Sequence, residues 1–177
     1  MFVHLADERD AASIRRAGIR AARYEFQQGA LRAAAAQGIA LDAIPRRAVF
    51  CLPLLPDIQA SYQWLRELKR RGARSYCAVH FRLPDAEPVW CHDYRAPPVA
   101  MTAAEAVRQV MTAPDPRGAQ VILPRAVAAG EIHAIRRIPQ LFGWRFHPGA
   151  KGTQSYWPWP GETRRNQLLK IYEKRFD

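Results

Sequence analysis

Three side chains that can hydrogen-bond lie in, or shortly after, segments that the sequence predicts to be buried strands. His4 lies inside an apolar segment near the N-terminus, Tyr62 follows the apolar run AVFCLPLLP, and Gln120 opens the run QVIL. Imidazole, phenol and amide groups can each hydrogen-bond to a polar ligand, but a glutamine carries no charge. A glutamate of nearly the same size would supply a negative charge at position 120. The amide there therefore decides what chemistry this set of residues can perform.

The remaining histidines, cysteines and glycines favour no other kind of site. The other histidines have no close metal-ligand spacing such as HxxxH; they are His80, His92, His133 and His147. The cysteines are odd in number and form no CxxC pair, so we expect small, free core side chains at Cys51, Cys77 and Cys91. No glycine-rich phosphate loop follows a strand, and no GxSxG motif occurs. A metal centre, a P-loop, a Rossmann site and a serine nucleophile are all disfavoured.

The pattern of apolar residues predicts short strands and a few helices that would position these side chains. We expect strands over residues 2–6, 48–56, 74–83 and 87–94, a strand from Gln120 onward, and an apolar stretch over residues 126–135. We expect helices over residues 7–19, 57–72 and 101–114, and over the last residues, 163–177. Asp7 and Asp57 would cap the first two helices, Gly18 and Gly72 would end them, and Thr102 with Glu105 would form a capping box on the third.

The order of these elements favours an α+β domain with a partly antiparallel core. The strands at 74–83 and 87–94 would pair as a hairpin across the turn PDAEP. Residues 20–47 are ambiguous, because their alanines favour a helix and their glycines interrupt it; a mobile loop over a site is the other interpretation. The length of 177 residues suits one domain, with a core over residues 1–140 and a basic, aromatic extension over residues 141–177 that packs on it.

The charge balance favours a polyanionic partner. The chain has 27 Lys and Arg residues against 16 Asp and Glu, a formal net charge of +11. This suits nucleic acid, a phosphate-rich cofactor or both, although an arginine-rich source organism would supply part of the excess. The runs ELKRRGAR, IRRIPQLFGWRF and SYWPWPGETRR suit contacts with phosphates and single-stranded bases, or equally a solvated helix end and a packed tail. No apolar run could cross a bilayer and no signal peptide opens the chain, so we expect a cytoplasmic protein without a membrane partner.

Three segments, taken in order, resemble the histidine–tyrosine–glutamate branch of the ADP-ribosyltransferase superfamily. FVHLADERDAASIRRAGI is similar to the first strand of that family with its histidine, and AVFCLPLLPDIQASYQWL to the strand-to-helix segment with its tyrosine. GAQVILPRAVAAGEIHAI is similar to the third segment, in which a glutamate normally precedes the apolar strand. The branch includes diphtheria-toxin-like enzymes and poly(ADP-ribose) polymerases, and the chain also looks broadly like bacterial toxins that modify DNA. The resemblance implies a split, mostly antiparallel sheet flanked by helices.

The resemblance also implies that the site breaks the bond between nicotinamide and ribose in NAD, which is then a substrate, without a metal. His4 would hold a ribose hydroxyl, the backbone of Leu5 would bind the nicotinamide amide, and Tyr62 would stack on the nicotinamide ring. Further contacts with NAD are expected from Phe50 and, at the pyrophosphate, from Arg15, Arg16 and Arg47. Position 120 would face the positive charge that develops on the ribose, as carboxylates do in glycosidases.

Gln120 departs from the family pattern, because an amide cannot supply the negative charge. We expect NAD binding to persist and the rate to fall by roughly 10²–10³ relative to a glutamate at this position. Three explanations stay open. The chain is a naturally weakened or inactive member, the glutamine is an inactivating substitution, or Glu131 or Glu105 is the catalytic carboxylate.

Two classes of function follow from these residues. In the first, the protein transfers ADP-ribose from NAD to a macromolecule, with nucleic acid favoured over protein as the acceptor. In the second, it is a non-enzymatic member of the same fold that binds NAD, ADP-ribose or nucleic acid. A third, less favoured hypothesis is RNA 2′-phosphotransferase chemistry, whose basic residues are not evident in the sequence.

Overall fold

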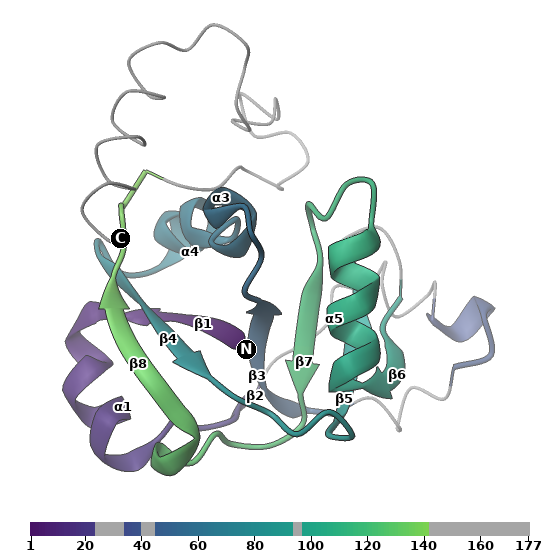
Figure 1. The fold of residues 1–177 in the computed structure, drawn as a ribbon, viewed down its shortest axis with the longest axis horizontal. Helices are drawn as coiled ribbons and strands as arrows, with labels where there is room; N and C mark the ends of the chain where they lie inside the picture. Colours follow the sequence, from purple (N-terminus) through teal and green to yellow (C-terminus); the bar gives the residue numbers. More distant parts are fainter. Residues whose placement is uncertain (24–33, 40–44, 94–96, 142–177) are drawn as a thin grey trace, which may run out of the picture.

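An open antiparallel sheet lies at the centre of the fold (Figure 1). The structure is a computed structural model that describes residues 1–23, 34–39, 45–93 and 97–141. In these residues the sheet has eight strands: β1 (Phe2–Asp7), β2 (Ala22–Arg23), β3 (Arg47–Pro53), β4 (Tyr76–Phe81), β5 (Pro88–His92), β6 (Val99–Thr102), β7 (Gln120–Leu123) and β8 (Ile132–Arg137). Seven follow the order β6-β5-β7-β3-β1-β4-β8, and β2 pairs with β3. The expected α+β class with a mostly antiparallel core is confirmed.

The two halves of the sheet are joined by a very short ladder between β1 and β3. The paired residues are Phe2 with Pro53 and Val3 with Leu52, whereas β1 pairs with β4 over its whole length. Beyond this ladder β1 and β3 separate, and the first two residues of β3 pair with β2 instead. Residues 4–6 of β1 and 49–51 of β3 are not paired with each other, although each stretch pairs with its other neighbour. We call this stretch the β1–β3 break. It lies in the middle of the sheet.

Short helices connect the strands, and their ends follow the expected caps. They are the 3-10 turn η1 (Glu8–Asp10), α1 (Ala11–Ala17), α3 (Ile58–Ser61), α4 (Leu65–Arg71), α5 (Ala103–Thr112) and the 3-10 turn η2 (Ala129–Glu131). Asp7 accepts a hydrogen bond from the backbone of Arg9, and the predicted capping box of Thr102 and Glu105 is present. Gly18 ends α1 with φ +82°, and a Cβ there would lie 2.1 Å from the carbonyl oxygen of Val127. Only glycine fits that close approach.

One predicted helix is in fact two. The sequence favours a single helix over residues 57–72, but α3 ends at Ser61 and α4 begins at Leu65. The turn between them is held by i→i−3 hydrogen bonds, from the N–H of Gln63 to Ala60 and from the N–H of Leu65 to Tyr62. Asp57 caps the first helix, because its carboxylate accepts from the backbone N–H of Gln59 at 2.8 Å. Gly72 follows the second helix, as expected. The turn between the helices frees the side chains of Gln63 and Trp64 for contacts outside the helix, which are described below.

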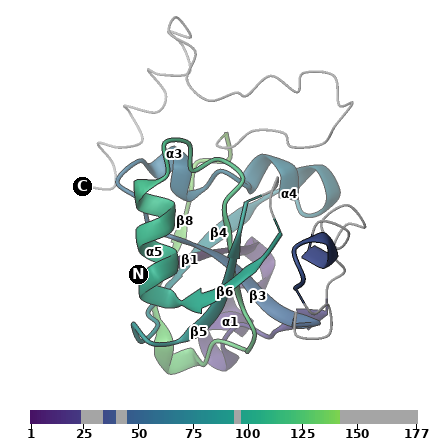
Figure 2. The ribbon, with the colours of Figure 1, turned by 90° about the vertical axis from the view of Figure 1, so that its right-hand side faces the viewer.

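The predicted hairpin of the strands near 74–83 and 87–94 is wrong. β4 pairs with β1 on one edge and β8 on the other, so it has no edge left for β5. The chain crosses instead to the other half of the sheet, where β5 pairs with β6 and β7. Residues 99–102 extend that half as β6 before α5 starts, so the predicted helix over residues 101–114 begins two residues later than expected (Figure 2). Turn residues alone suggested the hairpin, but competition between strand edges determines the pairing.

The half of the sheet formed by β3, β7 and β5 has one fully buried face and one partly open face. Cys51, Val121 and Cys91 are partners across these strands and are all buried, and α5 packs against β3 and β5. Cys77 is buried as well, so the expectation of free core cysteines is confirmed. Successive side chains of a strand point to opposite faces. On the opposite face Phe50, Trp90, His92 and Gln120 are partly buried, whereas Ile122 between them is fully buried.

Several expectations fall on residues that the structure does not describe. They include most of the ambiguous segment 20–47, of which β2 and a helical turn at residues 34–36 are described. The extension over residues 141–177 and its terminal helix lie outside the described residues, apart from Leu141. Within the described residues, no helix is long and apolar enough to span a membrane.

Candidate functional site

His4 lies at the β1–β3 break and bridges the two strands with its side chain. Its Nδ1 lies 2.7 Å from the carbonyl oxygen of Phe50 in β3. A carbonyl oxygen only accepts, so Nδ1 carries the proton. Burial lowers the pKa of His4, and the hydrogen bond to Phe50 raises it by a smaller amount. The net effect favours the neutral imidazole. The other ring nitrogen, Nε2, then presents a lone pair that can accept a hydrogen bond from a hydroxyl group.

The backbone of Leu5 faces the same break. Leu54 donates its N–H to the carbonyl of Met1 across β1 and β3, while Glu8 donates to Ser75 on the β4 side. Backbone groups alternate along an antiparallel strand, so odd-numbered residues of β1 point toward β3. Leu5 would continue this ladder opposite Phe50, but the ladder ends at Val3. The N–H and C=O of Leu5 therefore face the break, where a ligand amide could pair with them as a strand would.

Gln120 stands at the start of β7 and is bonded to a histidine that the sequence did not single out. Its Oε1 lies 2.9 Å from Nε2 of His92, its partner residue in β5. Both side chains are partly buried and share the partly open face of the sheet with Phe50 and Trp90. Continuing the β3–β7 ladder by one residue places Gln120 beside Leu52 of β3. Because β3 lies between β7 and β1, the two outer strands are about 10 Å apart.

The structure brings together some of the predicted site residues and separates others. His4, Leu5 and Phe50 converge on the β1–β3 break. In the described part of the chain no hydrogen bond joins His4 to Tyr62 or Gln120. Gln120 faces its own partner in β5, on the far side of β3 from β1.

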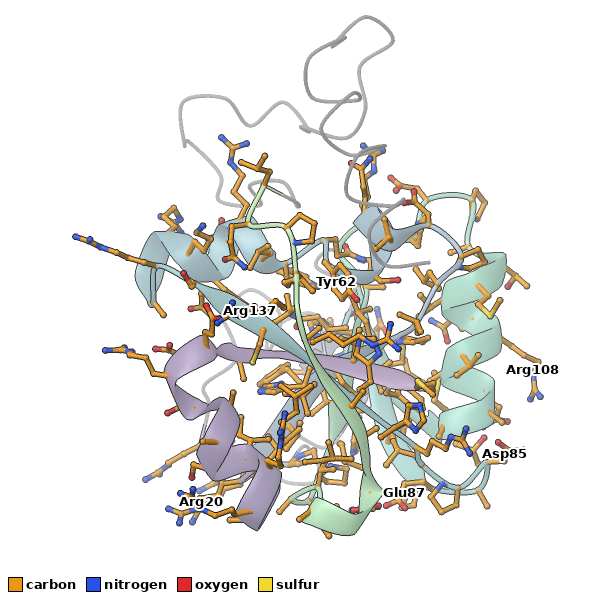
Figure 3. The ribbon with its side chains drawn as sticks, turned by 60° about the vertical axis from the view of Figure 1, so that its left-hand side comes forward. Arg20, Tyr62, Asp85, Glu87, Arg108 and Arg137 are labelled. Carbon is orange, nitrogen blue, oxygen red and sulfur yellow. The ribbon has the colours of Figure 1, made fainter. Side chains whose placement is uncertain are left out.

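Tyr62 is packed inside the protein, between the α3–α4 segment and the sheet (Figure 3). Only 4% of the residue is exposed, and its hydroxyl lies 3.2 Å from Nε2 of His80 in β4. His80 pairs with Val3, so this contact lies on the sheet face to which Val3 points. In this arrangement the ring of Tyr62 is covered. Its stacking on nicotinamide stays a prediction, which would require the ring to become accessible.

Two residues next to Tyr62 hold the segment that leads to Gln120. Gln63 is 0% exposed; its Nε2 donates to the carbonyl of Pro116 at 3.0 Å, and its Oε1 accepts from the N–H of Gly118 at 2.7 Å. The indole N–H of Trp64 donates to the carbonyl of Ala119 at 2.9 Å. We call these three hydrogen bonds the 63–64 latch. They fix residues 116–119, and so the point at which β7 begins.

The candidate pyrophosphate partners lie away from the break. Arg15 and Arg16 are exposed in the last turn of α1. Arg47 is exposed at the start of β3, three residues from Phe50, and its Nε contacts the carbonyl of Ala21 at 3.4 Å. Its partner across the β2–β3 ladder is Arg23, so two like charges face each other. Like charges directly opposite each other are unfavourable in a sheet.

The alternative carboxylates are engaged elsewhere. Glu131 binds Arg125 and the backbone of Ala128, beyond the far end of β7 from Gln120. Glu87, labelled in Figure 3, binds the same arginine, which ties the start of β5 to η2. Glu105 is held by Thr102 at the N-terminus of α5. Both Glu131 and Glu105 thus have structural partners and lie apart from the pair formed by Gln120 and His92.

No cluster in the described residues adds a second candidate centre. No group of three or more His, Cys, Asp or Glu side chains there could hold a metal ion. His92 is the residue that sequence reasoning missed. The sequence did hold a signal, because His92 is a polar residue in the predicted strand over residues 87–94. No local pattern, however, links His92 to position 120.

No family model matches the chain, and comparisons with curated proteins and with solved structures give no match either.

Proposed function

We propose that the protein is an NAD-using ADP-ribosyltransferase whose substrate binds at the β1–β3 break. The observation that carries this proposal is the hydrogen bond from Nδ1 of His4 to the carbonyl of Phe50. It holds the imidazole at the break with Nε2 available to a ribose hydroxyl. The N–H and C=O of Leu5, which the alternation of β1 turns to the same place, suit the amide of nicotinamide.

The proposed reaction requires little covalent participation by the protein. The bond between nicotinamide and C1 of the ribose breaks, and nicotinamide leaves with the electron pair. A nucleophile of the acceptor then bonds to C1 and loses a proton to solvent. Positive charge develops on the ribose between these events, and a carboxylate nearby would stabilise it. Gln120 is uncharged, so this chain lacks that stabilisation at position 120.

The first prediction concerns this missing charge. Replacing Gln120 with glutamate should raise the rate of NAD cleavage by roughly 10²–10³, because a carboxylate would face the developing positive charge. Release of nicotinamide, with and without single-stranded DNA, RNA or protein as acceptor, measures the effect. NAD affinity should change far less than the rate.

Gln109→Glu is the matched control, because it makes the same change on an exposed position of α5. That variant should release nicotinamide no faster than the unchanged protein. If Gln120→Glu and the unchanged protein both release none with any acceptor, the proposed enzymatic function is wrong.

A non-enzymatic binder is the second candidate function, and one observation favours it. The amide oxygen of Gln120 is already bonded to His92, and an amide has no negative charge to offer the ribose. Such a protein would hold NAD or ADP-ribose without turnover. Calorimetry with NAD separates the two candidates: binding together with an inactive Gln120→Glu variant supports the binder.

The acceptor that we propose is nucleic acid, on the basis of charge. A net charge of +11 favours a polyanion over most protein surfaces. Arg47 is exposed at the start of β3, the strand of Phe50, and the exposed Arg46 and Arg23 lie just before β3 and opposite Arg47 in β2, so all three add local positive charge. The same proposal includes the fold: the split sheet would be that of the ADP-ribosyltransferases.

A further inference from the structure

His92 and Gln120 form a side-chain pair that fixes the orientation of an amide. The two residues are partners in the β5–β7 ladder, and Nε2 of His92 lies 2.9 Å from Oε1 of Gln120. An amide oxygen accepts and cannot donate, so Nε2 of His92 carries the proton in this contact. The imidazole is therefore the donor, whatever its charge.

The orientation of this amide has a consequence for any ligand on the open face. Oε1 of Gln120 points toward β5, on one side of β7, where His92 lies. The NH2 group is bonded to the same carbon and so points away from His92. On the other side of β7 lies β3, which carries Phe50 and borders the break. Position 120 therefore offers its N–H donors on the side away from His92.

We propose that His92 is a positioning residue for the side chain at position 120, and that in the native chain it turns the N–H donors of Gln120 toward a hydroxyl oxygen of the ligand ribose. This inference rests on the proposed function for the identity of the ligand. It does not rest on turnover, because the orientation of the amide is a property of the free protein.

The same histidine would serve a glutamate at position 120. Its N–H would donate to one carboxylate oxygen and leave the second oxygen for the ribose. A donated hydrogen bond stabilises the charged form and lowers the pKa of the carboxyl group. The glutamate variant would then stay ionised, and active, to lower pH with His92 than without it. A residue that merely supported folding would not move that pH profile.

The first arm of the experiment uses nitrogen-15 NMR of the native chain and needs no activity. We expect the Nε2–H tautomer at His92 and two well-separated side-chain NH2 signals from Gln120 that shift when ADP-ribose is added. In His92→Phe the two NH2 signals should move toward the positions that they have in a solvent-exposed glutamine. His92→Gln, which keeps an N–H donor near the position of Nε2, should restore them.

The second arm measures nicotinamide release in the Gln120→Glu background. Adding His92→Phe should lower kcat by roughly tenfold with little change in KM, and should move the acid limb of the pH profile to higher pH. Adding His92→Gln should recover most of kcat. Thermal unfolding of each variant establishes that the compared proteins are folded.

Three results overturn the inference: an Nδ1–H tautomer at His92, Gln120 signals unaffected by His92→Phe, or an acid limb that does not move in an active Gln120→Glu background. An inactive Gln120→Glu variant counts against the proposed function instead. In that case the NMR arm still decides whether His92 orients the amide.

Discussion

At the scale of single residues, the contact between Tyr62 and His80 makes the fold sensitive to acid. The ring of His80 is buried and its Nε2 lies 3.2 Å from the hydroxyl of Tyr62. Burial lowers the pKa of His80 to about 4, with smaller contributions from the charges of Arg136 and His133. The folded protein therefore keeps His80 neutral over a pH range in which an unfolded chain would protonate it.

The resulting prediction is a loss of stability on acidification. An unfolded histidine takes up its proton near pH 6.5 and the folded His80 only near about 4, so its contribution is intact above 6.5 and is lost as the pH falls toward 4. Thermal unfolding across this range should show a steeper decline for the unchanged protein than for His80→Gln, which does not titrate. His133→Gln, at an exposed position, should keep most of the steep decline, because burial lowers the pKa of His80 more than the charge of His133 does. Parallel curves for the unchanged protein and His80→Gln would contradict the prediction.

The sequence could indicate His4 and Gln120 but could not indicate how they are used. Both are polar residues in apolar strands, and that contrast is visible in one dimension. The bond of His4 to Phe50 requires that β1 and β3 lie side by side and then part, which depends on residues 46 positions away. His92 was missed for the same reason, since its pairing with Gln120 depends on the β5–β7 register.

At the scale of elements, the 63–64 latch couples the α3–α4 turn to the start of β7. Gln63 alone satisfies two backbone groups of residues 116–118 from a fully buried position. Helical periodicity predicted one continuous helix here because Ile58, Leu65 and Leu68 fit one apolar face. It could not show the bonds that Gln63 and Trp64 make with residues 116–119, because these depend on a segment more than 50 positions away.

Removing the latch amide should destabilise the protein and loosen the segment before Gln120. Gln63→Met keeps the volume but leaves the N–H of Gly118 and the carbonyl of Pro116 unpaired in the interior, at a cost of about 3 kcal/mol. Denaturant unfolding measures the loss, and hydrogen exchange of residues 117–121 should quicken. Gln59→Met, at a partly exposed position of α3, is the control and should change little. Equal losses in both variants would show that the latch contributes nothing specific.

At the scale of the whole molecule, the class of the fold was predictable and the strand order was not. Alternating apolar residues revealed most strands, and caps revealed the helix ends. The order of strands in the sheet follows from which edges are occupied: β8, from late in the sequence, takes the edge of β4 that the predicted hairpin needed. Such long-range competition leaves no mark in a local pattern.

The distribution of charge is the other property of the whole molecule that bears on function. Arg20, Arg23, Arg46 and Arg47 are all exposed in or next to the β2–β3 ladder; we call them the arginine cluster. Figure 3 shows Arg20 of this cluster near the end of α1, well apart from Arg108 on α5. Arg23 faces Arg47 across the ladder, so the cluster concentrates charge that a polyanion would neutralise.

The last prediction therefore concerns salt. Affinity for a single-stranded oligonucleotide should fall steeply as salt rises, with a logarithmic slope of about −0.7 for each phosphate that is neutralised. The double variant Arg20→Gln, Arg23→Gln should weaken binding and make this slope shallower by about 1.4, because two phosphate contacts are lost. Arg108→Gln removes an exposed arginine outside the cluster and should leave the slope unchanged. Fluorescence anisotropy across a salt series measures all three proteins. Equal slopes would mean that the arginine cluster does not contact the strand, and salt-independent binding would remove the argument for a nucleic-acid acceptor.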